Sequence, residues 1–136
     1  MPKRSGYMIN SNVFDYVNVL DKASDAAWMR NEAISHNIAN VSTPNYKRQD
    51  VAFEDTLRRA MSDAKYIETD HKVSSLRLRS LTPTTYTDYS GYSYRTDGNN
   101  VDIDTENAYL ASNQIKYNAL IDSTNQEFRR LSMVMK

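Results

Sequence analysis

The stretch Asn37-Ile38-Ala39-Asn40-Val41-Ser42-Thr43-Pro44-Asn45-Tyr46-Lys47 decides how this chain folds, because it ends a long helical pattern and turns the chain. Proline lacks an N–H donor and disfavours helical geometry in the residue before it, so the helix must end before Pro44. Residues 43–46 fit a turn with proline second, and Asn45 in third place suits a positive φ. The amides of Asn37 and Asn40 can bond free carbonyls at the helix end, or fix how this corner docks on a neighbour.

Upstream of this corner, the pattern predicts one long helix over residues 13–42, preceded by an irregular leader over residues 1–12. Ser11 or Asn12 is the expected N-cap, because a short oxygen-bearing side chain can accept from the free N–H groups of the first turn. Apolar residues recur at steps of three and four, which indicates a heptad-like seam. The seam comprises Val13, Val17, Leu20, Ala27, Ile34, Ile38 and Val41, and Ser24 and Asn31 fill its gaps.

A second long helix, with its capping turn, is predicted over residues 97–136. Asp97-Gly98-Asn99-Asn100 is a turn signal, Asp102 or Asp104 is the expected cap, and Glu106 suits the dipole of the first turn. A flank of smaller residues beside the seam allows contact with more than one neighbour. The seam comprises Leu110, Tyr117, Ile121, Phe128, Leu131 and Met135, and Gln114 and Thr124 fill its gaps.

The middle of the chain, residues 43–96, carries weaker signals. Helical spacing predicts a short helix over residues 50–65 with Asp50 as its cap, and period-two alternation predicts a strand over residues 76–81. The cluster Tyr86, Tyr89, Tyr92 and Tyr94 indicates either a lateral contact surface, or a mobile loop or small strand pair. The predicted fold is therefore mainly α: an antiparallel coiled-coil hairpin with a short helix and a polar, Tyr-rich, partly irregular or β middle segment.

Composition excludes several classes of function. Lys and Arg number 17, as do Asp and Glu, and this zero net charge argues against a nucleic-acid binder and against a polybasic membrane-surface protein. The absence of cysteine excludes disulfides, thiolate zinc sites and cysteine nucleophiles. No apolar run approaches the ~20 residues of a membrane-spanning helix, and no apolar segment of a cleaved signal peptide follows the N-terminus.

The residues offer little for catalysis or metal binding. His36 and His71 fall on different predicted elements, and neither has a second ligand at helical spacing. The acidic run over residues 97–104 fails as a calcium loop, because its glycine and the required final glutamate are misplaced. We therefore expect no enzyme activity, no catalytic or metal-binding residue and no cofactor.

The opening stretch resembles the N-terminal signature of the bacterial flagellar rod, hook and related axial proteins. The matching residues are Asn37, Ile38, Ala39, Asn40, Thr43, Pro44, Asn45, Tyr46 and Lys47. The family usually has glycine where this chain has Asn45, a mild departure because both residues accept a positive φ. Residues 97–106, 110–111 and 113–117, with the segment 50–55 and the short length, are similar to a small member of the proximal rod.

The resemblance implies a structural subunit of the basal-body rod, on the periplasmic or cell-wall side, exported by the flagellar type III apparatus without a cleaved signal. Its implied partners are further copies, FlgC and other rod subunits, the rod-base adaptor FliE, the MS ring and the export gate. The terminal-helix seams would be its assembly interface. Two alternatives stay open: another short axial protein such as the second proximal rod subunit, and a cytoplasmic helical type III export chaperone.

Overall fold

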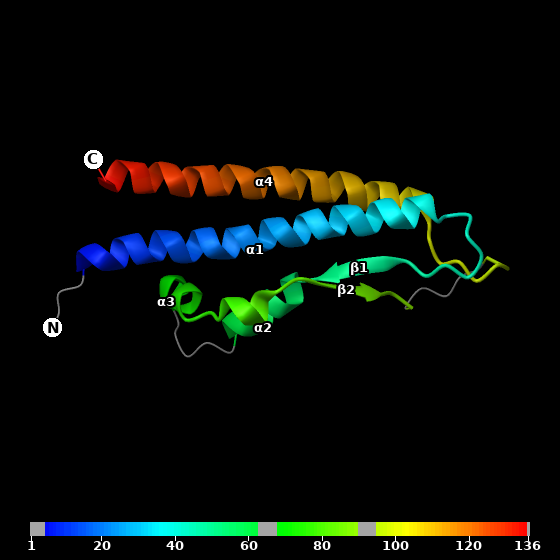
Figure 1. The fold of residues 1–136 in the computed structure, drawn as a ribbon, viewed down its shortest axis with the longest axis horizontal. Coiled ribbons are helices and arrows are strands. Elements are labelled where there is room, and N and C mark those ends of the chain that lie inside the picture. Colours follow the sequence, from blue (N-terminus) through cyan, green and yellow to red (C-terminus); the bar gives the residue numbers. More distant parts are fainter. Residues whose placement is uncertain (1–4, 63–67, 90–94, 136) are drawn as a thin grey trace. The chain divides into compact units, whose positions relative to one another are not determined.

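The computed structural model describes residues 5–62, 68–89 and 95–135 of the chain, and side chains from residue 14 onward. Two long helices dominate it (Figure 1): α1 spans Ser5–Ala39 and α4 spans Ile103–Met135. Between them lie β1 (Gln49–Ala52), α2 (Glu54–Ser62), α3 (Thr69–Ser74), the 3-10 helix η1 (Leu78–Leu81) and β2 (Thr84–Thr87). The predicted fold class is confirmed, since the two long helices pack together and the middle carries a small antiparallel sheet.

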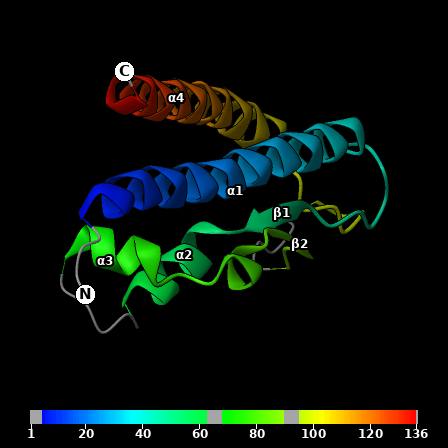
Figure 2. The same ribbon diagram turned by 60° about the vertical axis from the view of Figure 1, so that its left-hand side comes forward.

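The chain forms two compact units, each built from part of both long helices and part of the middle segment. The first unit comprises Met1–Ser24, Phe53–Thr82 and Ala119–Lys136, and the second comprises Asp25–Ala52 and Pro83–Asn118. In each unit, the portions of α1 and α4 run antiparallel, and the middle elements lie on the side of α1 away from most of α4 (Figure 2).

The first unit has a small core. Phe53, Val73 and Leu81 are buried, and they come from the start of α2, from α3 and from η1. The Tyr16 hydroxyl of α1 donates a hydrogen bond of 2.7 Å to Asp70 of α3. This bond and the burial of Val73 hold the short α3 in place, because six residues alone would not form a stable helix.

The second unit has its core along one face of α1. Its buried apolar residues are mostly small, which lets neighbouring backbones approach closely; they are Ala26, Ala27, Ala33, Ile34, Val51 and Val101. Strands β1 and β2 pair antiparallel from Gln49↔Thr87 to Ala52↔Thr84. Only Val51 of these strands is fully buried, so the sheet contributes one apolar anchor and otherwise a polar face.

The helix boundaries differ from those predicted at the N-terminal end. Helix α1 begins at Ser5, inside the segment 1–12 expected to be irregular, so Ser11 and Asn12 lie within it and do not cap it. No proline occurs between Ser5 and Pro44, and nothing in that stretch forces a break. At the other boundary the prediction holds, because α1 ends at Ala39, before Pro44.

The capping turn of α4 follows the sequence closely. The Asp102 carboxylate accepts from the amides of Asp104 at 3.1 Å and Thr105 at 3.4 Å, which makes Asp102 the cap. Helix α4 then begins at Ile103.

Two predictions for the middle are wrong. Residues 49–52 form a strand, so the short helix begins at Glu54 and Asp50 does not cap it. Residues 78–81 form the 3-10 helix η1, not a strand, and β1 pairs instead with the threonine-rich segment Thr84–Thr87. A strand must pair with a neighbouring strand, and the alternation of apolar and polar residues over 76–81 does not show whether such a neighbour is present.

Candidate assembly site: a buried polar corner and the helix seams

Asn37 is the centre of a polar corner in the second unit. It is fully buried in the last turn of α1. Its Oδ1 accepts from the Gln49 amide at 2.8 Å and from the Tyr46 hydroxyl at 3.1 Å. Its Nδ2 donates to the Gln49 carbonyl at 2.8 Å and to Glu106 Oε2 at 3.2 Å. One side chain therefore joins the end of α1 to β1 and to α4.

Asn40 forms hydrogen bonds at the end of the helix itself, which Asn37 does not. Its Nδ2 donates to the His36 carbonyl at 2.8 Å, and its Oδ1 accepts from the Thr43 hydroxyl at 3.0 Å. Asn40 therefore bonds the helix end, as predicted, whereas Asn37 binds other segments of the same chain, and docking of this corner on a neighbour stays a prediction.

The turn after α1 forms as predicted. The Tyr46 amide donates to the Thr43 carbonyl at 3.3 Å, and Asn45 has a φ of 63°. The Asn45 amide then donates to the Asp97 carbonyl at 2.7 Å. Gly98 also has a positive φ, of 78°, and a Cβ built there would lie 2.6 Å from Asn45 Oδ1. The positive φ favours glycine at residue 98, and a Cβ there would also require the Asn45 side chain to move.

Asn99 completes the end of α1 from the far part of the sequence. It is fully buried, and its Nδ2 donates to three carbonyls of the corner, those of Asn40 at 2.8 Å, Val41 at 3.2 Å and Thr43 at 2.8 Å. Its Oδ1 accepts from the Val101 amide at 2.8 Å. The carbonyls of Asn40 and Thr43 also accept from backbone amides of the turn, so the Asn99 side chain adds bonds that hold its own segment against the corner.

Arg48 forms the ionic part of the corner. Its Nε lies 2.6 Å from Glu106 Oε1 and its Nη1 lies 2.7 Å from Asp88 Oδ2, with Asp50 further away at 3.7 Å. The side chain of Arg48 is 13% exposed and that of Glu106 is 1% exposed. The guanidinium also lies over the Tyr109 ring, 5.4 Å from its centroid.

Burial alone would lower the Arg48 pKa, but the hydrogen bonds to Glu106 and Asp88 and the nearby carboxylates outweigh it and raise the pKa. Burial, and then the charge of Glu106, raises the pKa of the Tyr46 hydroxyl against the opposing charge of Arg48. The arginine therefore stays charged and the tyrosine neutral near pH 7. A charged arginine and a neutral tyrosine suit a structural role better than proton transfer.

Lys47 strengthens the same joint by donating from Nζ to the Gly98 carbonyl. Asn100 adds two bonds, accepting from the Arg48 amide at 2.8 Å and donating to the Asp88 carbonyl at 2.8 Å. Ordinary sequence signals do not single out Arg48, Asn99 or Asn100. The run Asp97-Gly98-Asn99-Asn100 predicts a turn before α4, but it does not predict that the side chains of Asn99 and Asn100 bond the segment after α1.

The predicted seam of α1 faces inward over much of its length. Ala27 and Ile34 are buried, Val17, Leu20, Ile38 and Val41 are half-buried, and the side chain of Val13 lies outside the described residues. On α4, Leu110, Tyr117 and Leu131 are half-buried. These positions are therefore at least partly covered within the chain, and their role in assembly stays a prediction.

The remaining predicted positions of α4 lie differently. Ile121, Phe128 and Met135 are exposed, whereas the residues one step before two of them, Leu120 and Glu127, are half-buried. Farther up the same helix Asn113 and Glu106 are buried. On α4 the more buried positions therefore lie one residue before the predicted Ile121 and Phe128. Ile121, Phe128 and Met135, spaced seven residues apart and here called the outer stripe, are exposed in the part of the chain that the structure describes.

Tyr86 and Tyr89 are exposed, on β2 and just after it, and Tyr92 and Tyr94 lie outside the described residues. Burial, and then the charges of Asp50 and Asp88, raises the pKa of the Tyr86 hydroxyl. The predicted lateral contacts therefore include two accessible tyrosines, Tyr86 and Tyr89.

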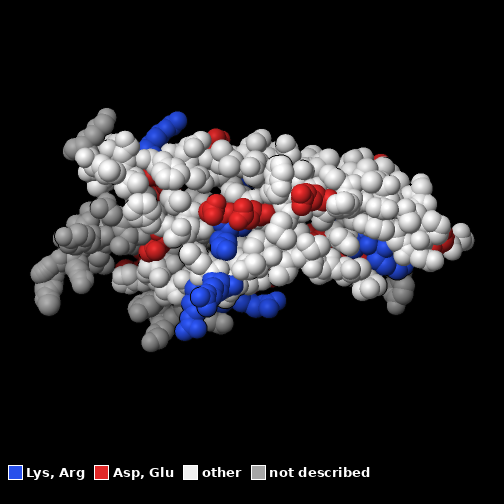
Figure 3. Space-filling view, in the orientation of Figure 1, with Lys and Arg blue, Asp and Glu red and all other residues white. Residues whose placement is uncertain are grey.

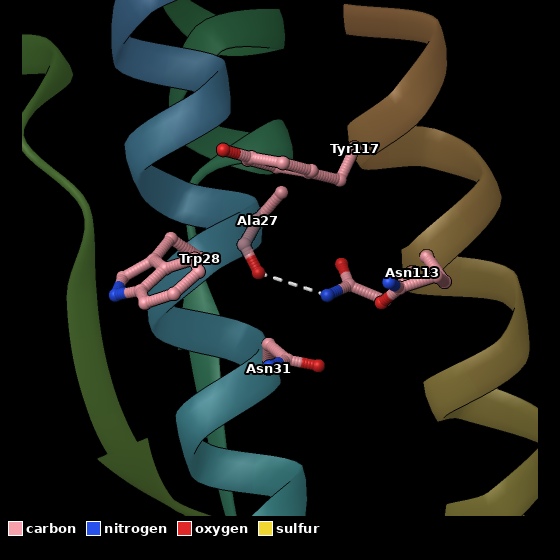
Figure 4. A pocket seen from close by; sticks show the side chains of 6 residues that line it. Ala27, Trp28, Asn31, Asn113 and Tyr117 are labelled. Carbon is pink, nitrogen blue, oxygen red and sulfur yellow. Dashed lines mark hydrogen bonds between the residues drawn. The ribbon is translucent and has the colours of Figure 1, made fainter. Parts of the chain in front are cut away.

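A hollow of about 70 Å³ lies between α1 and α4 in the second unit (Figure 4). Ala27, Trp28 and Asn31 line it from α1, and Asn113, Gln114 and Tyr117 line it from α4. The Trp28 and Tyr117 rings are 6.3 Å apart and tilted by 49°. Asn113 Nδ2 donates to the Ala27 carbonyl at 2.8 Å, and among the described residues nothing donates to its Oδ1.

Within the part of the chain that the structure describes, no cluster of three or more His, Cys, Asp or Glu side chains could hold a metal ion. His36 and His71 are both exposed, on α1 and α3. None of the described helices is long and apolar enough to cross a membrane.

No family model matches the chain. Curated proteins do. A flagellar basal body rod protein FlgB from Bacillus subtilis is 37% identical over 118 residues, covering 85% of this chain and 89% of the relative. The FlgB of Borrelia hermsii is 33% identical over 135 residues, 92% of this chain and 99% of that protein. The FlgB of Escherichia coli is 28% identical over 118 residues, 79% of this chain and 83% of the relative.

Proposed function

This chain belongs to the FlgB family of flagellar basal body rod proteins, and from that premise we propose how it serves as a structural subunit. In this proposal the terminal helices pack with those of neighbouring subunits in the proximal rod. The rod then acts as the shaft between the MS ring and the distal rod, and carries torque. The role is architectural, without catalysis or a cofactor.

The outer stripe of α4 is the observation that carries the proposal. Phe128 is 49% exposed at its centre, and the flanking Ile121 and Met135 are exposed as well. Three large apolar side chains at seven-residue spacing form the face that a further helix packs against in a coiled coil. Burial of these side chains by another helix would be favourable, so we propose that a helix of a neighbouring subunit packs on this stripe.

A second flank of α4 supports more than one neighbour. Ile115 is 71% exposed, and the small residues Ala108, Ala111 and Ala119 on its side of the helix are exposed too. Small residues permit close approach of a second helix. We therefore propose that α4 contacts two neighbouring subunits, and that the remaining predicted interface positions bind within the hairpin.

The polar corner supports the proposal that the chain carries torque. A buried ionic network contributes little net stability, because desolvation offsets its attraction, but removing one member is costly. Such a joint resists sliding of α1 past α4, since a shift would separate Asn37, in the last turn of α1, from Glu106 of α4. We propose that the signature segment is needed to hold this register under torque.

We propose further that the chain leaves the cytoplasm through the flagellar type III apparatus without a cleaved signal, and meets FlgC, FliE and the MS ring in the basal body. Mass spectrometry of detergent-purified hook–basal bodies tests the location. Recovery of the chain after the cytoplasmic ring has been removed supports a rod subunit. Recovery from the cytosol alone, as a stable dimer, would favour an export chaperone and overturn the proposal.

A further inference from the structure

The contact between α1 and α4 in the second unit is loosely packed. Ala27 and Asn31 on α1, and Asn113 and Gln114 on α4, line the hollow of about 70 Å³ between the two helices. Side chains in a protein interior normally fill such space, and the atoms around a hollow lose the contacts that a filled site would make. Packing therefore holds this stretch of the hairpin less firmly than it holds a well-filled helix pair.

Asn113 weakens the same contact through its incomplete hydrogen bonding. The residue is 4% exposed, and its Nδ2 donates to the Ala27 carbonyl at 2.8 Å (Figure 4). The amide cannot be turned over, because its oxygen would then face the oxygen of that carbonyl. Its Oδ1 is buried and receives no donor from the described residues. A buried acceptor without a donor costs free energy, so only half of this amide is compensated for its loss of water.

The hydrogen bond that Asn113 does form is not one that α1 requires. Ala27 lies well inside α1, which spans Ser5–Ala39, and a carbonyl inside a helix already accepts from the amide four residues later. An apolar side chain of similar size at residue 113 would therefore leave no polar group of α1 without a partner. We expect leucine at this position to stabilise the hairpin, and asparagine to keep it weaker.

The charged groups beside this contact do not set the free energy of opening it. Asp25 and Glu32 of α1 are exposed, and Figure 3 shows acidic side chains along the middle of this helix. Because these carboxylates are already in water, separating the helices would change their solvation little. At this stretch, the free energy of separating α1 from α4 depends on the buried contact around Asn113.

We propose that Asn113 and the hollow form a built-in weak point at which α1 and α4 separate when the chain is exported. One helix with its side chains is about 10–12 Å across, and a packed neighbour adds about 8–10 Å between the axes. A chain that passes through a conduit narrower than this pair must separate the two helices first. The weak point lowers the free energy of that step, and the helices pair again after export. This use of the weak point rests on the proposed function, which includes export by the type III apparatus.

Asn113→Leu in the full chain tests the weak point in solution. Urea denaturation followed by circular dichroism should give a higher midpoint than in the wild type. Hydrogen exchange of the backbone amides over residues 25–34 should slow roughly tenfold, which is the effect of removing one unpaired buried acceptor. Asn118→Leu is the matched control, because it makes the same change at an exposed position of α4 and should alter neither measurement.

Cell fractionation of the source bacterium tests the use of the weak point. The amount of chain recovered outside the cytoplasm should fall several-fold for Asn113→Leu and stay at the wild-type level for Asn118→Leu. Adding Gly98→Ala, which strains the backbone of the same unit, should restore export of the Asn113→Leu chain. Such a restoration shows that export depends on how easily the unit opens, and not on recognition of the Asn113 side chain.

A urea midpoint of Asn113→Leu at or below that of the wild type overturns the weak point. Unchanged export of a stabilised Asn113→Leu chain also overturns it, as does a loss of export that Gly98→Ala does not reverse. A wild-type chain confined to the cytosol is a different result, because it refutes the proposed export route and with it the use given to the weak point. The midpoint and the exchange rates then still decide whether the contact itself is weak.

Discussion

Removing the arginine of the polar corner tests whether the joint depends on ionic pairing. In Arg48→Met, the carboxylate of Glu106, 1% exposed, loses the guanidinium that lies 2.6 Å away. Asn37 still donates to that carboxylate, but at 3.2 Å and from a neutral amide. Leaving a buried charge without its partner costs about 3–5 kcal/mol, which is a large share of the ~5–15 kcal/mol that stabilises a typical domain.

Urea denaturation followed by emission of the single tryptophan measures this loss. Trp28 belongs to the same unit as the corner, so it reports the opening of that unit. Arg58→Met is the matched control, because its pair with Asp55 is exposed (76% and 65%) and such pairs contribute about 0–1 kcal/mol. In the double variant Arg48→Met with Glu106→Gln, most of the lost stability should return, since the fully buried carboxylate is then neutral and Asp88, 19% exposed, is partly solvated. A loss in Arg48→Met as small as in the control would refute the reasoning.

Three further outcomes are expected. Gly98→Ala should lower stability by about 1 kcal/mol or more in the same assay, because φ is 78° and the new Cβ would lie 2.6 Å from a side-chain oxygen; an unchanged midpoint contradicts this. Ile121→Asp should leave the monomer folded but abolish swimming and rod formation, whereas Asn125→Asp, at an exposed position of α4, should do neither; motile Ile121→Asp cells would remove the outer stripe from the interface. The hydrogen bond to Asp70, then burial, raises the Tyr16 pKa to about 12. Stability from this neutral phenol is therefore fully present below pH 10 and is lost as the pH rises through about 12. The stability difference from Tyr16→Phe should shrink over that window, and a difference that stays constant counts against the bond.

The parts of the fold that the sequence predicts are those with local causes. Pro44 ends α1 wherever the rest of the chain goes, Asn45 accepts the positive φ of the turn, and Asp102 caps α4 through its own side chain. Each of these effects acts over a few residues, and so reading the residues in order is enough to find it.

The face on which the two helices pair depends on more than local pattern. Its inner stripe on α4 includes Glu106, Asn113 and Glu127, polar residues that hydropathy assigns to solvent. They face inward because partners distant in sequence receive them, Arg48 for Glu106 and the Ala27 carbonyl for Asn113. Hydropathy favoured Ile121 and Phe128 for that face, which the structure leaves exposed.

The middle segment was predicted to be partly β, but its strands could not be placed, for a similar reason. Strand β1 spans only four residues, and its signal is overridden by the helical spacing that follows it. Its partner β2 lies more than thirty residues later, as the pairing of Ala52 with Thr84 shows. Threonine-rich composition in Thr84–Thr87 favours a strand, but the choice of partner is a tertiary effect.

The long sequence separation between Asn99 and its hydrogen-bond partners affects the order in which the chain can fold. Its amide completes the end of α1 at Asn40, 59 residues earlier, and Arg48 and Glu106 are separated by 58. A polypeptide synthesised from its N-terminus therefore has an unfinished first helix until about three quarters of it exists. Closing so long a loop is slow compared with forming local helix. Asn99 bonds the corner after α1, and Glu106 and Asn113, which bond Asn37 and the Ala27 carbonyl, come later still, so α1 reaches its final contacts only when most of the chain is present.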